Sequence, residues 1–338
     1  MGNCHERNEL DGCSTISEAD FEFIKPIGRG AFGTVWDSRH KKTNVPLALK
    51  VFTKASITTQ DALNSILKER AILSILSHPF IINMKLAFHS TRKLFLGLDL
   101  KLGGDLRFHI TKKKFNEPEI KFVLCCVIQA LEFVHSCNFI HKDVKPENIV
   151  LDNSGYAFLT DFGTCELIKT QNGTETSGTP GYMAPEVICR QNHSFVSDFF
   201  SLGIILYEVI MGNRPYMGKN RQEIRQSILN AQVSIHKESI PEGWTEESVD
   251  ICNGLLKRKP SSRLGAGGVQ EILQHPWFAD FDLEKLKKFE LKAPFVPEKE
   301  NNYDKSHVNC NVKRRVNKLK IENKSFVGYF FRPKLMSC

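Results

Sequence analysis

The sequence predicts an α+β protein made of a small β-rich part followed by a larger, mainly helical part. Short runs of strand character occupy residues 21–98, with a single helical stretch among them. After Gly103 and Gly104 the pattern changes to longer amphipathic stretches separated by Pro- and Gly-rich segments. The length of 338 residues agrees with two domains or two lobes, since a domain averages about 150 residues.

In the small part, strands are expected at 21–24, 34–36 and 47–52, after a polar, aperiodic leader at 1–20. The helical stretch is 61–76, because apolar residues recur there at helical spacing: Leu63, Ile66, Leu67, Ile72 and Leu73. In the large part, helices are expected at 118–136, 197–212, 221–231 and 246–258.

Composition excludes several classes of protein. Hydrophobic residues make up 41% and charged residues 25%, which excludes collagen-like, fibrous and wholly disordered chains. No apolar run approaches the ~18 residues that cross a bilayer, and the start of the chain has no secretory signal pattern. The ten cysteines form no CxxC pair and no zinc-like cluster with histidine. We therefore expect reduced thiols in a cytoplasmic protein. We also expect a monomer.

Positive charge is concentrated at the C-terminal end. The whole chain carries 46 − 38 = +8, and residues 311–338 carry 8 − 1 = +7 of it. The body is nearly neutral, so no nucleic-acid partner is expected. A basic tail suits the surface of a membrane instead.

A glycine-rich segment lies between two strand-like runs. Gly28, Gly30, Gly33 and Val35 fit the pattern GxGxxGxV. Glycines let backbone N–H groups approach phosphate oxygens without obstruction by Cβ. A plain Gly-rich hairpin is one alternative. A Rossmann loop is the other, but it needs a helix next, and residues 35–40 have strand character.

Lys50 follows in an apolar strand, where a buried lysine needs an anionic partner. Glu69 on the helical stretch is one candidate partner, and a nucleotide phosphate is another.

The pattern that decides the function lies in the middle of the chain. His141-Lys-Asp-Val-Lys-Pro-Glu-Asn148 is followed by Asp161-Phe-Gly163 and then by Ala184-Pro-Glu186. With the glycine-rich segment and Lys50, these form an ordered series that matches the protein-kinase signature set. The sequence therefore resembles a eukaryotic protein kinase over residues 21–278, with further resemblance in the tail.

This resemblance implies the bilobal protein-kinase fold. The N-lobe would span 21–98, the hinge 99–102 and the C-lobe 103–278. Residues 279–338 would form a tail that wraps towards the N-lobe. The hinge backbone would hydrogen-bond the adenine of ATP, with Leu98 as gatekeeper.

The resemblance also assigns roles in a reaction that uses ATP and Mg²⁺. Asp143 would accept the proton of the substrate hydroxyl, and Lys145 would steady the moving phosphoryl group. Asn148 and Asp161 would bind Mg²⁺, which prefers oxygen ligands and keeps phosphates and water in its shell. An isolated Asp or Asn usually forms turns, but each of these stands at its motif position.

Lys50 would bind the α- and β-phosphates of the nucleotide, and Glu69 would hold Lys50 in place. The residues expected against the nucleotide are Gly28, Gly30, Gly33, Val35, Ala48, Lys50, Asp99, Asp105, Asn148 and Asp161.

Further positions match residues that support the site in kinases. Asp198 would hold the backbone of the catalytic segment, and Arg263 would pair with Glu186. An apolar spine that links the lobes, or equally a plain core, would contain Leu73, Met84, His141 and Phe162.

Two regions resemble the AGC group of Ser/Thr kinases. One is 255–265 together with 275–278, and the other is a tail that begins at 293–297 and ends in a hydrophobic motif at 326–331. In the group, this motif docks its aromatic side chains into a groove on the small lobe. Similarity to the YANK subgroup is found in 102–107, in 181–186 and in the Met-Gly start.

Met1-Gly-Asn-Cys4 resembles a dual-acylation start, with myristate on Gly2 and palmitate on Cys4. Glu6 departs from the motif, whose sixth residue is usually Ser or Thr. One myristoyl chain anchors weakly, so Cys4 or the basic tail would supply the second signal for membrane association. The alternative is an unmodified leader and a solvated tail.

The substrates implied are proteins with Ser or Thr acceptors, which Lys145-Pro146 favours over Tyr. Asp105, Glu147 and Glu208 stand where kinases of basic sites place the acids that bind substrate arginines. They predict phosphorylation at arginine-containing sites. The alternative is that they are solvated surface carboxylates, above all Asp105.

The activation loop departs from most AGC kinases. Glu175 stands where a phosphothreonine usually orders the loop, and the basic receivers of that phosphate are replaced by Lys142, Glu166 and Ser65. Arg binds phosphate bidentately whereas Lys is a point charge, so one Lys facing one carboxylate is a consistent substitute. In the hydrophobic motif, Phe330 stands where Ser or Thr is often phosphorylated.

These departures predict a kinase that is active without loop phosphorylation. The alternatives are phosphorylation at the flanking Thr174 or Thr176, and a loop ordered by packing alone. A pseudokinase scaffold is a different function, which the intact catalytic residues disfavour. A lipid or small-molecule kinase is disfavoured by residues 178–182, which resemble a peptide-docking loop.

Overall fold

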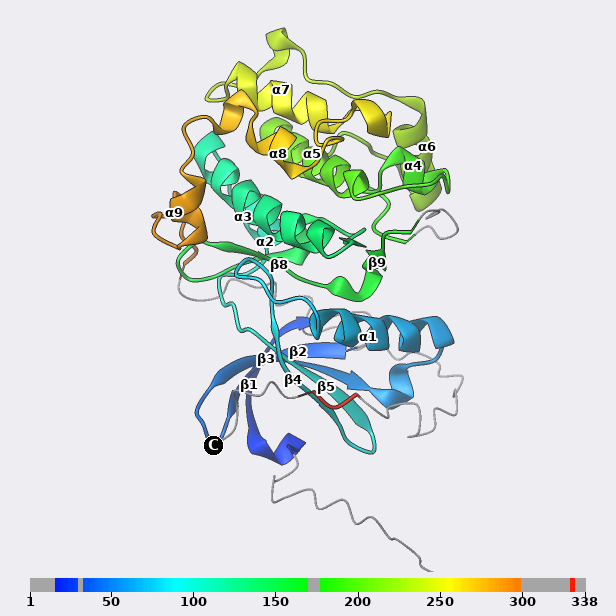
Figure 1. Ribbon diagram of the computed structural model, residues 1–338, viewed down its shortest axis with the longest axis vertical. Coiled ribbons are helices and arrows are strands. Elements are labelled where there is room, and N and C mark those ends of the chain that lie inside the picture. Colours follow the sequence, from blue (N-terminus) through cyan, green and yellow to red (C-terminus); the bar gives the residue numbers. More distant parts are fainter. Residues whose placement is uncertain (1–15, 30–32, 170–176, 299–328, 332–338) are drawn as a thin grey trace, which may run out of the picture.

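The computed structural model of the chain describes residues 16–29, 33–169, 177–298 and 329–331. They form two lobes, one built on a sheet and the other on helices (Figure 1), which confirms the predicted bilobal α+β fold. Among the helices of these residues, none has the length and apolarity needed to cross a membrane. Predicted features outside the described residues are Gly2, Cys4, Gly30, Thr174, Glu175, Thr176 and most of the basic tail.

The small lobe contains a five-stranded antiparallel sheet in the order β1-β2-β3-β5-β4. Its strands are β1 (Phe21–Arg29), β2 (Gly33–His40), β3 (Pro46–Thr53), β4 (Met84–His89) and β5 (Lys93–Leu98). The first three are longer than the runs predicted from apolar residues, because ladder hydrogen bonds continue through polar residues.

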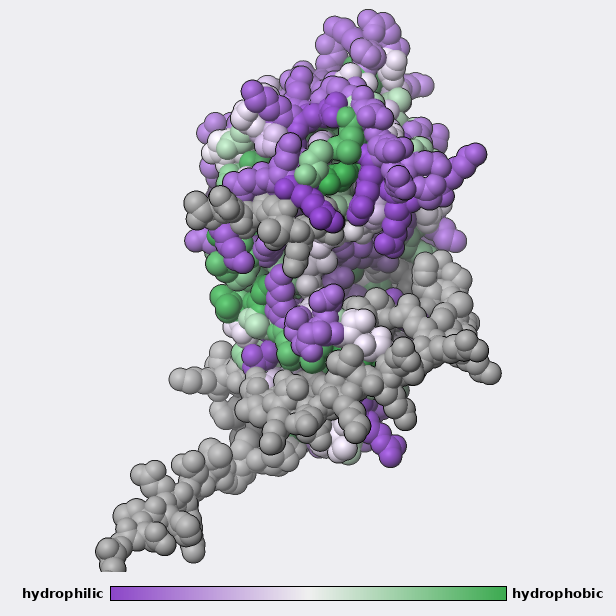
Figure 2. Space-filling view, turned by 90° about the vertical axis from the view of Figure 1, so that its right-hand side faces the viewer, coloured by the Kyte–Doolittle hydropathy of each residue, from purple (hydrophilic) through white to green (hydrophobic). Residues whose placement is uncertain are grey.

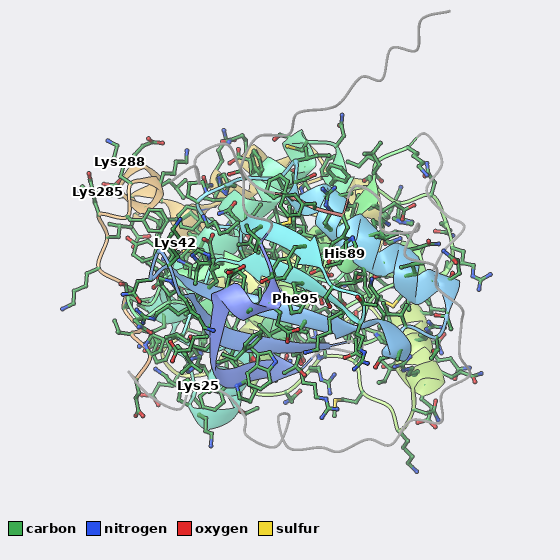
Figure 3. The ribbon with its side chains drawn as sticks, turned by 90° about the horizontal axis from the view of Figure 1, so that it is seen from below. Lys25, Lys42, His89, Phe95, Lys285 and Lys288 are labelled. Carbon is green, nitrogen blue, oxygen red and sulfur yellow. The ribbon has the colours of Figure 1, made fainter. Side chains whose placement is uncertain are left out.

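The sheet is buried on both faces. One face belongs to the main core, and the other carries a smaller apolar cluster around Phe95. Phe95 is fully buried and stacks on Phe88, with ring centroids 4.4 Å apart, and Phe21 continues the stack. Figure 3 shows Phe95 near the middle of the lobe and Lys25 at its edge.

Helix α1 (Gln60–Leu73) packs beside the sheet and begins after Thr59, whose side chain caps it. The helix is shorter than the predicted 61–76. The Ser74 hydroxyl donates to a carbonyl of the last turn at 2.6 Å as the chain leaves the helix. Leu76 is nevertheless buried, and this is why the apolar spacing continues past the helix end.

The large lobe is mainly helical. Its helices are α2 (Leu106–Lys112), α3 (Glu117–Ser136), α4 (Pro185–Ile188), α5 (Val196–Met211), α6 (Arg221–Asn230), α7 (Glu246–Leu255), α8 (Val269–Leu273) and α9 (Leu283–Lys287). Its short strand pairs are β6 (Phe139–Ile140) with β9 (Glu166–Leu167) and β7 (Ile149–Leu151) with β8 (Ala157–Leu159). Most residues of α3 and α5 are buried, so these two helices form the centre of the lobe.

Helix α7 ends at Leu255, earlier than the predicted 246–258. The carbonyls of Lys257 and Arg258 instead accept hydrogen bonds from the guanidinium of Arg263, at 2.9 and 3.1 Å. Residues 257 and 258 therefore lie beyond the helix and hold the side chain of Arg263.

The tail contacts both lobes. Phe295 packs against His109 and Phe115 of the large lobe, with ring centroids 5.0 and 5.1 Å apart. Phe331 pairs with Ala87 of β4 through two backbone hydrogen bonds of 2.8 and 2.9 Å. The described end of the tail therefore lies along the small lobe (red in Figure 1), in agreement with the predicted wrapping.

The described surface is mainly hydrophilic on the face drawn in Figure 2, and its apolar areas are small. Exposed large apolar side chains such as Ile75 and Met217 are isolated. Single exposed apolar residues of this kind are normal on a protein surface.

Candidate active site

Lys50 and Glu69 are joined inside the small lobe. The ammonium of Lys50, on β3, donates hydrogen bonds of 2.6 and 2.9 Å to the two carboxylate oxygens of Glu69, on α1. Their side chains are only 16% and 5% exposed. Burial disfavours a charged amine, but the carboxylates of Glu69 and Asp161 raise the pKa of Lys50 above its usual value. The structure therefore brings the predicted lysine and acid together with the lysine charged.

Asp161 approaches the same ammonium from the large lobe. Its Oδ1 lies 3.8 Å from Lys50 Nζ, and the charge of Lys50 lowers the pKa of Asp161. The backbone of Asp161 is left-handed, with φ 66°, a costly conformation that clusters at functional sites. Phe162 is fully buried against the ring of His141, at 5.1 Å between centroids. All four predicted spine residues are buried: Leu73, Met84, His141 and Phe162.

Asp143 is held by four hydrogen bonds. Its Oδ1 accepts from the amide and the hydroxyl of Thr179, at 2.9 and 2.7 Å. Its Oδ2 accepts from Lys145 Nζ at 2.6 Å and from Asn148 Nδ2 at 3.0 Å. The carboxylate is buried and fixed in orientation, which a proton acceptor needs in order to meet a substrate hydroxyl. The structure thus brings three of the predicted site residues into one network.

Thr179 is a member of this network that the sequence predictions do not include. Its hydroxyl donates to Asp143 and accepts from Lys145 Nζ at 2.8 Å, so it links both predicted catalytic side chains. Thr179 lies 36 residues after Asp143. The sequence offers one indication of a role for Thr179, which is its position in the segment 178–182. That segment resembles a peptide-docking loop, and this resemblance does not predict a contact with Asp143.

Asn148 and Asp161 offer oxygen atoms that suit a divalent cation. The amide nitrogen of Asn148 donates to the carbonyl and the carboxylate of Asp143, which leaves its amide oxygen as the ligand atom. The side chain of Asp161 is 47% exposed, and its lowered pKa keeps it ionised. Within the described residues, no group of three or more His, Cys, Asp or Glu could hold a metal alone. A cation here would share phosphate and water oxygens, as Mg²⁺ usually does.

Asp198 ties the backbone of the catalytic segment to α5. Its buried carboxylate accepts from the amides of His141 and Lys142, both at 2.9 Å, and from His135 Nε2 at 2.8 Å. Burial opposes ionisation, yet these hydrogen bonds lower the pKa of Asp198. Lys142 has a left-handed backbone, with φ 68°, and its bond to Asp198 offsets the cost of that conformation. The geometry agrees with the predicted supporting role.

Gly28 lies in β1 and Gly33 begins β2, whereas Gly30 lies outside the described residues. A Cβ on Gly33 would lie 2.2 Å from the carbonyl oxygen of Val51 on β3. No side chain fits at that distance, so the close approach of the start of β2 to β3 requires glycine at position 33.

Val35 and Ala48 lie in the sheet next to the predicted phosphate-binding lysine. Val35 is opposite Lys50 in the β2–β3 ladder. Ala48 is opposite Leu98, the predicted gatekeeper, in the β3–β5 ladder. The sheet thus places these predicted nucleotide-binding residues on neighbouring positions of three strands.

Asp99 and Asp105 use their carboxylates within the protein. Asp99 accepts from the amide and the side chain of Asn83, at 3.1 and 3.0 Å, and pairs with Lys85 at 2.8 Å. Its predicted role concerns the hinge backbone, and there the amide of Asp99 already donates to the carbonyl of Asn83 at 3.0 Å. The Asp99 carbonyl is therefore the backbone group that could serve the predicted contact with adenine. Asp105 caps α2 by accepting from the amide of Phe108 at 2.8 Å.

Lys142 has a carboxylate partner, Glu166 of β9, and its own side chain is 1% exposed. Burial opposes ionisation of Glu166, but the hydrogen bond from Lys142 lowers the pKa of that carboxyl. The loop position Glu175 lies outside the described residues, and Glu166 supplies the counter-charge in the described part. At the third altered position, the Ser65 hydroxyl donates to the carbonyl of Gly163 at 3.1 Å.

The predicted pair of Arg263 and Glu186 is present and buried. It anchors the segment that follows Thr179, because Glu186 lies in α4 and Arg263 follows α7. The pair therefore ties α4, which begins six residues after Thr179, to the segment that follows α7.

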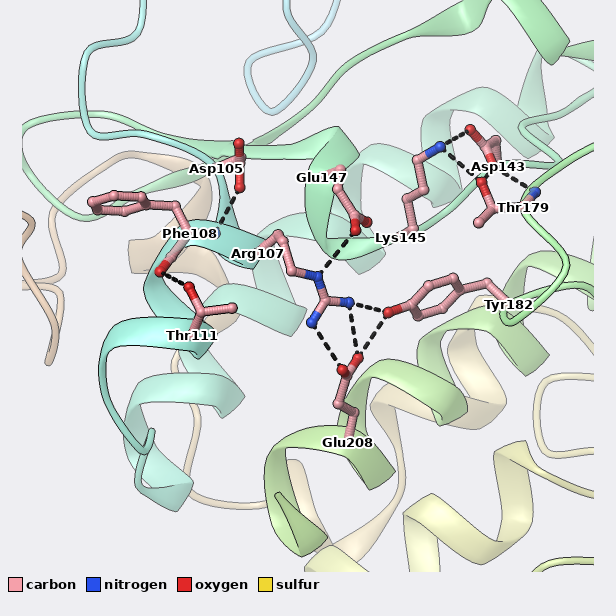
Figure 4. A network of polar contacts seen from close by, with 10 residues as sticks. All are labelled: Asp105, Arg107, Phe108, Thr111, Asp143, Lys145, Glu147, Thr179, Tyr182 and Glu208. Atoms are coloured by element: carbon pink, nitrogen blue, oxygen red, sulfur yellow. Dashed lines mark hydrogen bonds and ion pairs between the residues drawn. The ribbon is translucent and has the colours of Figure 1, made fainter. Parts of the chain in front are cut away.

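The acids predicted to receive substrate arginines are already in contact with groups of the chain (Figure 4). Arg107, on α2, donates from Nε to Glu147 at 3.0 Å and from Nη1 and Nη2 to the two oxygens of Glu208 at 2.8 and 3.0 Å. Its Nη2 also contacts the hydroxyl of Tyr182, which donates to Glu208 at 2.7 Å. The third acid, Asp105, is the cap of α2.

Comparison with known proteins gives one family. The family model described as "Protein kinase domain" matches residues 21–278. Protein kinase 2 of Dictyostelium discoideum is 38% identical over 296 residues, which are 87% of this chain and 61% of that protein. The serine/threonine-protein kinase gad8 of Schizosaccharomyces pombe is 38% identical over 290 residues, 85% of this chain and 50% of that protein.

The serine/threonine-protein kinase sgk-1 of Caenorhabditis elegans is 35% identical over 302 residues, 87% of this chain and 64% of that protein. The chain thus spans between half and two thirds of the length of these curated relatives.

Proposed function

The chain belongs to the protein kinase family, and we propose that it transfers the γ-phosphoryl group of ATP to serine and threonine residues of proteins. Its resemblance to the AGC group and the Ser/Thr kinases among its relatives support this substrate class. The observation that carries the proposal is Asp143, whose carboxylate four hydrogen bonds fix in place.

Phosphoryl transfer depends on positioning and on stabilisation of charge more than on covalent chemistry. In this proposal the substrate hydroxyl replaces one of the four hydrogen bonds to the Asp143 carboxylate, which then accepts the proton of that hydroxyl. Lys145 and Thr179 orient that carboxylate, and the ammonium of Lys145 places a positive charge beside it. Lys50 binds the nucleotide phosphates, and Glu69 keeps its charge in a fixed position.

Asn148 and Asp161 are proposed to hold Mg²⁺, which when bound neutralises charge on the phosphates. Asp161 suits this role because its pKa is lowered, so it is ionised at neutral pH. Asn148 suits it because its nitrogen already bonds Asp143 and orients the amide oxygen.

Activity without loop phosphorylation is part of the proposal. A phosphate would neutralise the basic residue next to Asp143, and Glu166 already supplies that negative charge to Lys142. Phosphorylation at Thr174 or Thr176 is the alternative. Phosphatase treatment followed by mass spectrometry decides between them, because activity lost together with phosphate at either threonine contradicts the proposal.

Arginine-containing acceptor sites also belong to the proposal, through the acidic residue Asp105 at the start of α2. Membrane association through acylation of Gly2 and Cys4, and cytoplasmic location, stay predictions. A Gly2→Ala variant that remains at the membrane would contradict the acylation.

The test is a phosphorylation assay of the full chain with ATP, Mg²⁺ and a peptide library containing Ser, Thr or Tyr acceptors. We expect transfer to Ser and Thr, and loss of transfer in the Asp143→Asn variant. Nucleotide binding without transfer by the wild type would instead support a pseudokinase scaffold. Transfer to lipids or small molecules alone would indicate another kinase class.

A further inference from the structure

Arg107 makes an unusually complete set of contacts for a partly exposed arginine. Both terminal nitrogens bind Glu208 as a fork, and Nε binds Glu147 from the side. Such bidentate pairs are the strong, directional form of the guanidinium–carboxylate interaction. Burial alone would favour the neutral guanidine, but the hydrogen bonds with Glu208 raise the pKa of Arg107 above its usual value. Its charge is therefore permanent and held in one place.

This cluster lies next to the candidate proton acceptor (Figure 4). Glu147 comes two residues after Lys145, and Tyr182 comes three residues after Thr179. Lys145 and Thr179 both bind Asp143 directly. A peptide that presents its hydroxyl to Asp143 therefore has neighbouring residues close to the two glutamates.

The cluster is also open to solvent on one side. The side chain of Glu147 is 44% exposed and that of Arg107 is 23% exposed, whereas Glu208 is 9% exposed. Without Arg107, the two glutamates would carry a charge of −2 at this place, with Glu208 the more buried and Glu147 the more exposed of the two. With Arg107, the net charge of the three side chains is −1. Both carboxylate oxygens of Glu208 already accept from Arg107, so a second guanidinium cannot bind them bidentately.

We propose that Arg107 determines specificity by occupying, from within the chain, the subsite that a substrate arginine would otherwise fill. The subsite next to Asp143 then accepts an uncharged or acidic substrate residue. This inference rests on the proposed function and narrows its substrate class.

The test is an arginine scan of one Ser peptide, in which a single arginine is moved through every position before the acceptor. Initial rates are compared for the full-length wild type, Arg107→Ala, Arg107→Ala with Glu208→Gln, and Lys112→Ala. Lys112 is the matched control because it is an exposed cation on the same helix. A peptide without arginine serves as the reference in each case.

We expect Arg107→Ala to gain an arginine preference of about tenfold at one position where the wild type has none, from a charge-assisted hydrogen bond of typical strength. Adding Glu208→Gln should abolish the gain, and Lys112→Ala should behave as the wild type. A wild type that already prefers arginine at that position, or an Arg107→Ala variant that gains no preference, would overturn the proposal.

Loss of Arg107 leaves a mostly buried glutamate with fewer partners, so Arg107→Ala can fail to fold. A single Glu208→Gln substitution then provides the test. If Arg107 fills the subsite, this variant keeps the arginine profile of the wild type. If a substrate arginine binds Glu208, one preference disappears and the inference is wrong. A wild type inactive on every peptide would contradict the proposed function instead.

Discussion

Arg263 binds both carboxylate oxygens of Glu186, at 2.6 and 2.9 Å, from a position 77 residues further along the chain. The guanidinium also donates to the carbonyls of Val196 and Lys257, at 3.0 and 2.9 Å, and the residue is 1% exposed. All three nitrogens of this buried guanidinium thus have acceptors within the protein itself.

Arg263→Ala should lower the free energy of unfolding by about 3–5 kcal/mol, because it leaves Glu186 charged and buried without a partner. Urea denaturation monitored by fluorescence measures the change. Lys287→Ala is the control, since it removes an exposed pair with Glu284 and should change stability by less than about 0.5 kcal/mol. Similar decreases in the free energy of unfolding in both variants would show that the buried pair stabilises the protein no more than an exposed pair does.

Thr179→Ala should lower kcat/KM by about tenfold, because Asp143 and Lys145 both lose the hydroxyl that orients them. Thr179→Ser retains the hydroxyl and should stay close to the wild type. Steady-state kinetics with one Ser peptide, alongside melting temperatures, measure the difference. Equal activity in the two variants would mean that Thr179 serves packing alone.

Glu166→Gln should destabilise the chain at neutral pH and lose this effect in acid. The folded pKa of Glu166 is depressed, so its contribution is present above the unfolded value of about 4.3 and disappears as the pH falls through the lower folded value. The difference in free energy of unfolding from the wild type should therefore shrink below about pH 4. Exposed Glu238→Gln is the control, and an acid-independent loss at Glu166 would contradict the assignment.

Arg70→Ala should loosen the end of the tail. Arg70 donates to the carbonyls of Tyr329 and Phe330, at 3.3 and 2.9 Å, and so joins α1 to the tail. We expect hydrogen exchange at the amide of Phe331 to accelerate about fivefold, from the loss of about one net hydrogen bond. Lys68→Ala, an exposed cation on the same helix, is the control and should leave that exchange unchanged.

The bilobal fold and the central site residues could be predicted from the sequence. Lys50 is a charged residue in an apolar strand, which requires a partner, and Asp143 and Asp161 stand in ordered motifs whose resemblance to the protein-kinase signature implies their roles. Glu69 was expected as the partner of Lys50 from its place on the helical stretch and from the same resemblance, and the structure buries it in α1. The order of the motifs along the chain, more than any one residue, makes these predictions specific.

The remaining contacts depend on tertiary packing. Arg107 and Glu208 are 101 residues apart, and the sequence predicts Glu208 as a partner of substrate arginines without indicating that it pairs with Arg107. Glu166 departs from a basic consensus, and only the β6–β9 pairing shows that it is the partner of Lys142. The predicted end of α1 is wrong for a similar reason. Leu76 lies beyond the helix but is as buried as the apolar residues within it, so its position continues the helical spacing of apolar residues.

The pairing of Lys142 with Glu166 has a consequence for control. A carboxylate that is part of the amino-acid sequence cannot be removed by a phosphatase, and its presence does not depend on any upstream enzyme. In the proposed function, the negative charge beside Lys142 is therefore always present. The kinase activity in the cell would then depend on how much of the protein is made, where it resides and how quickly it is degraded.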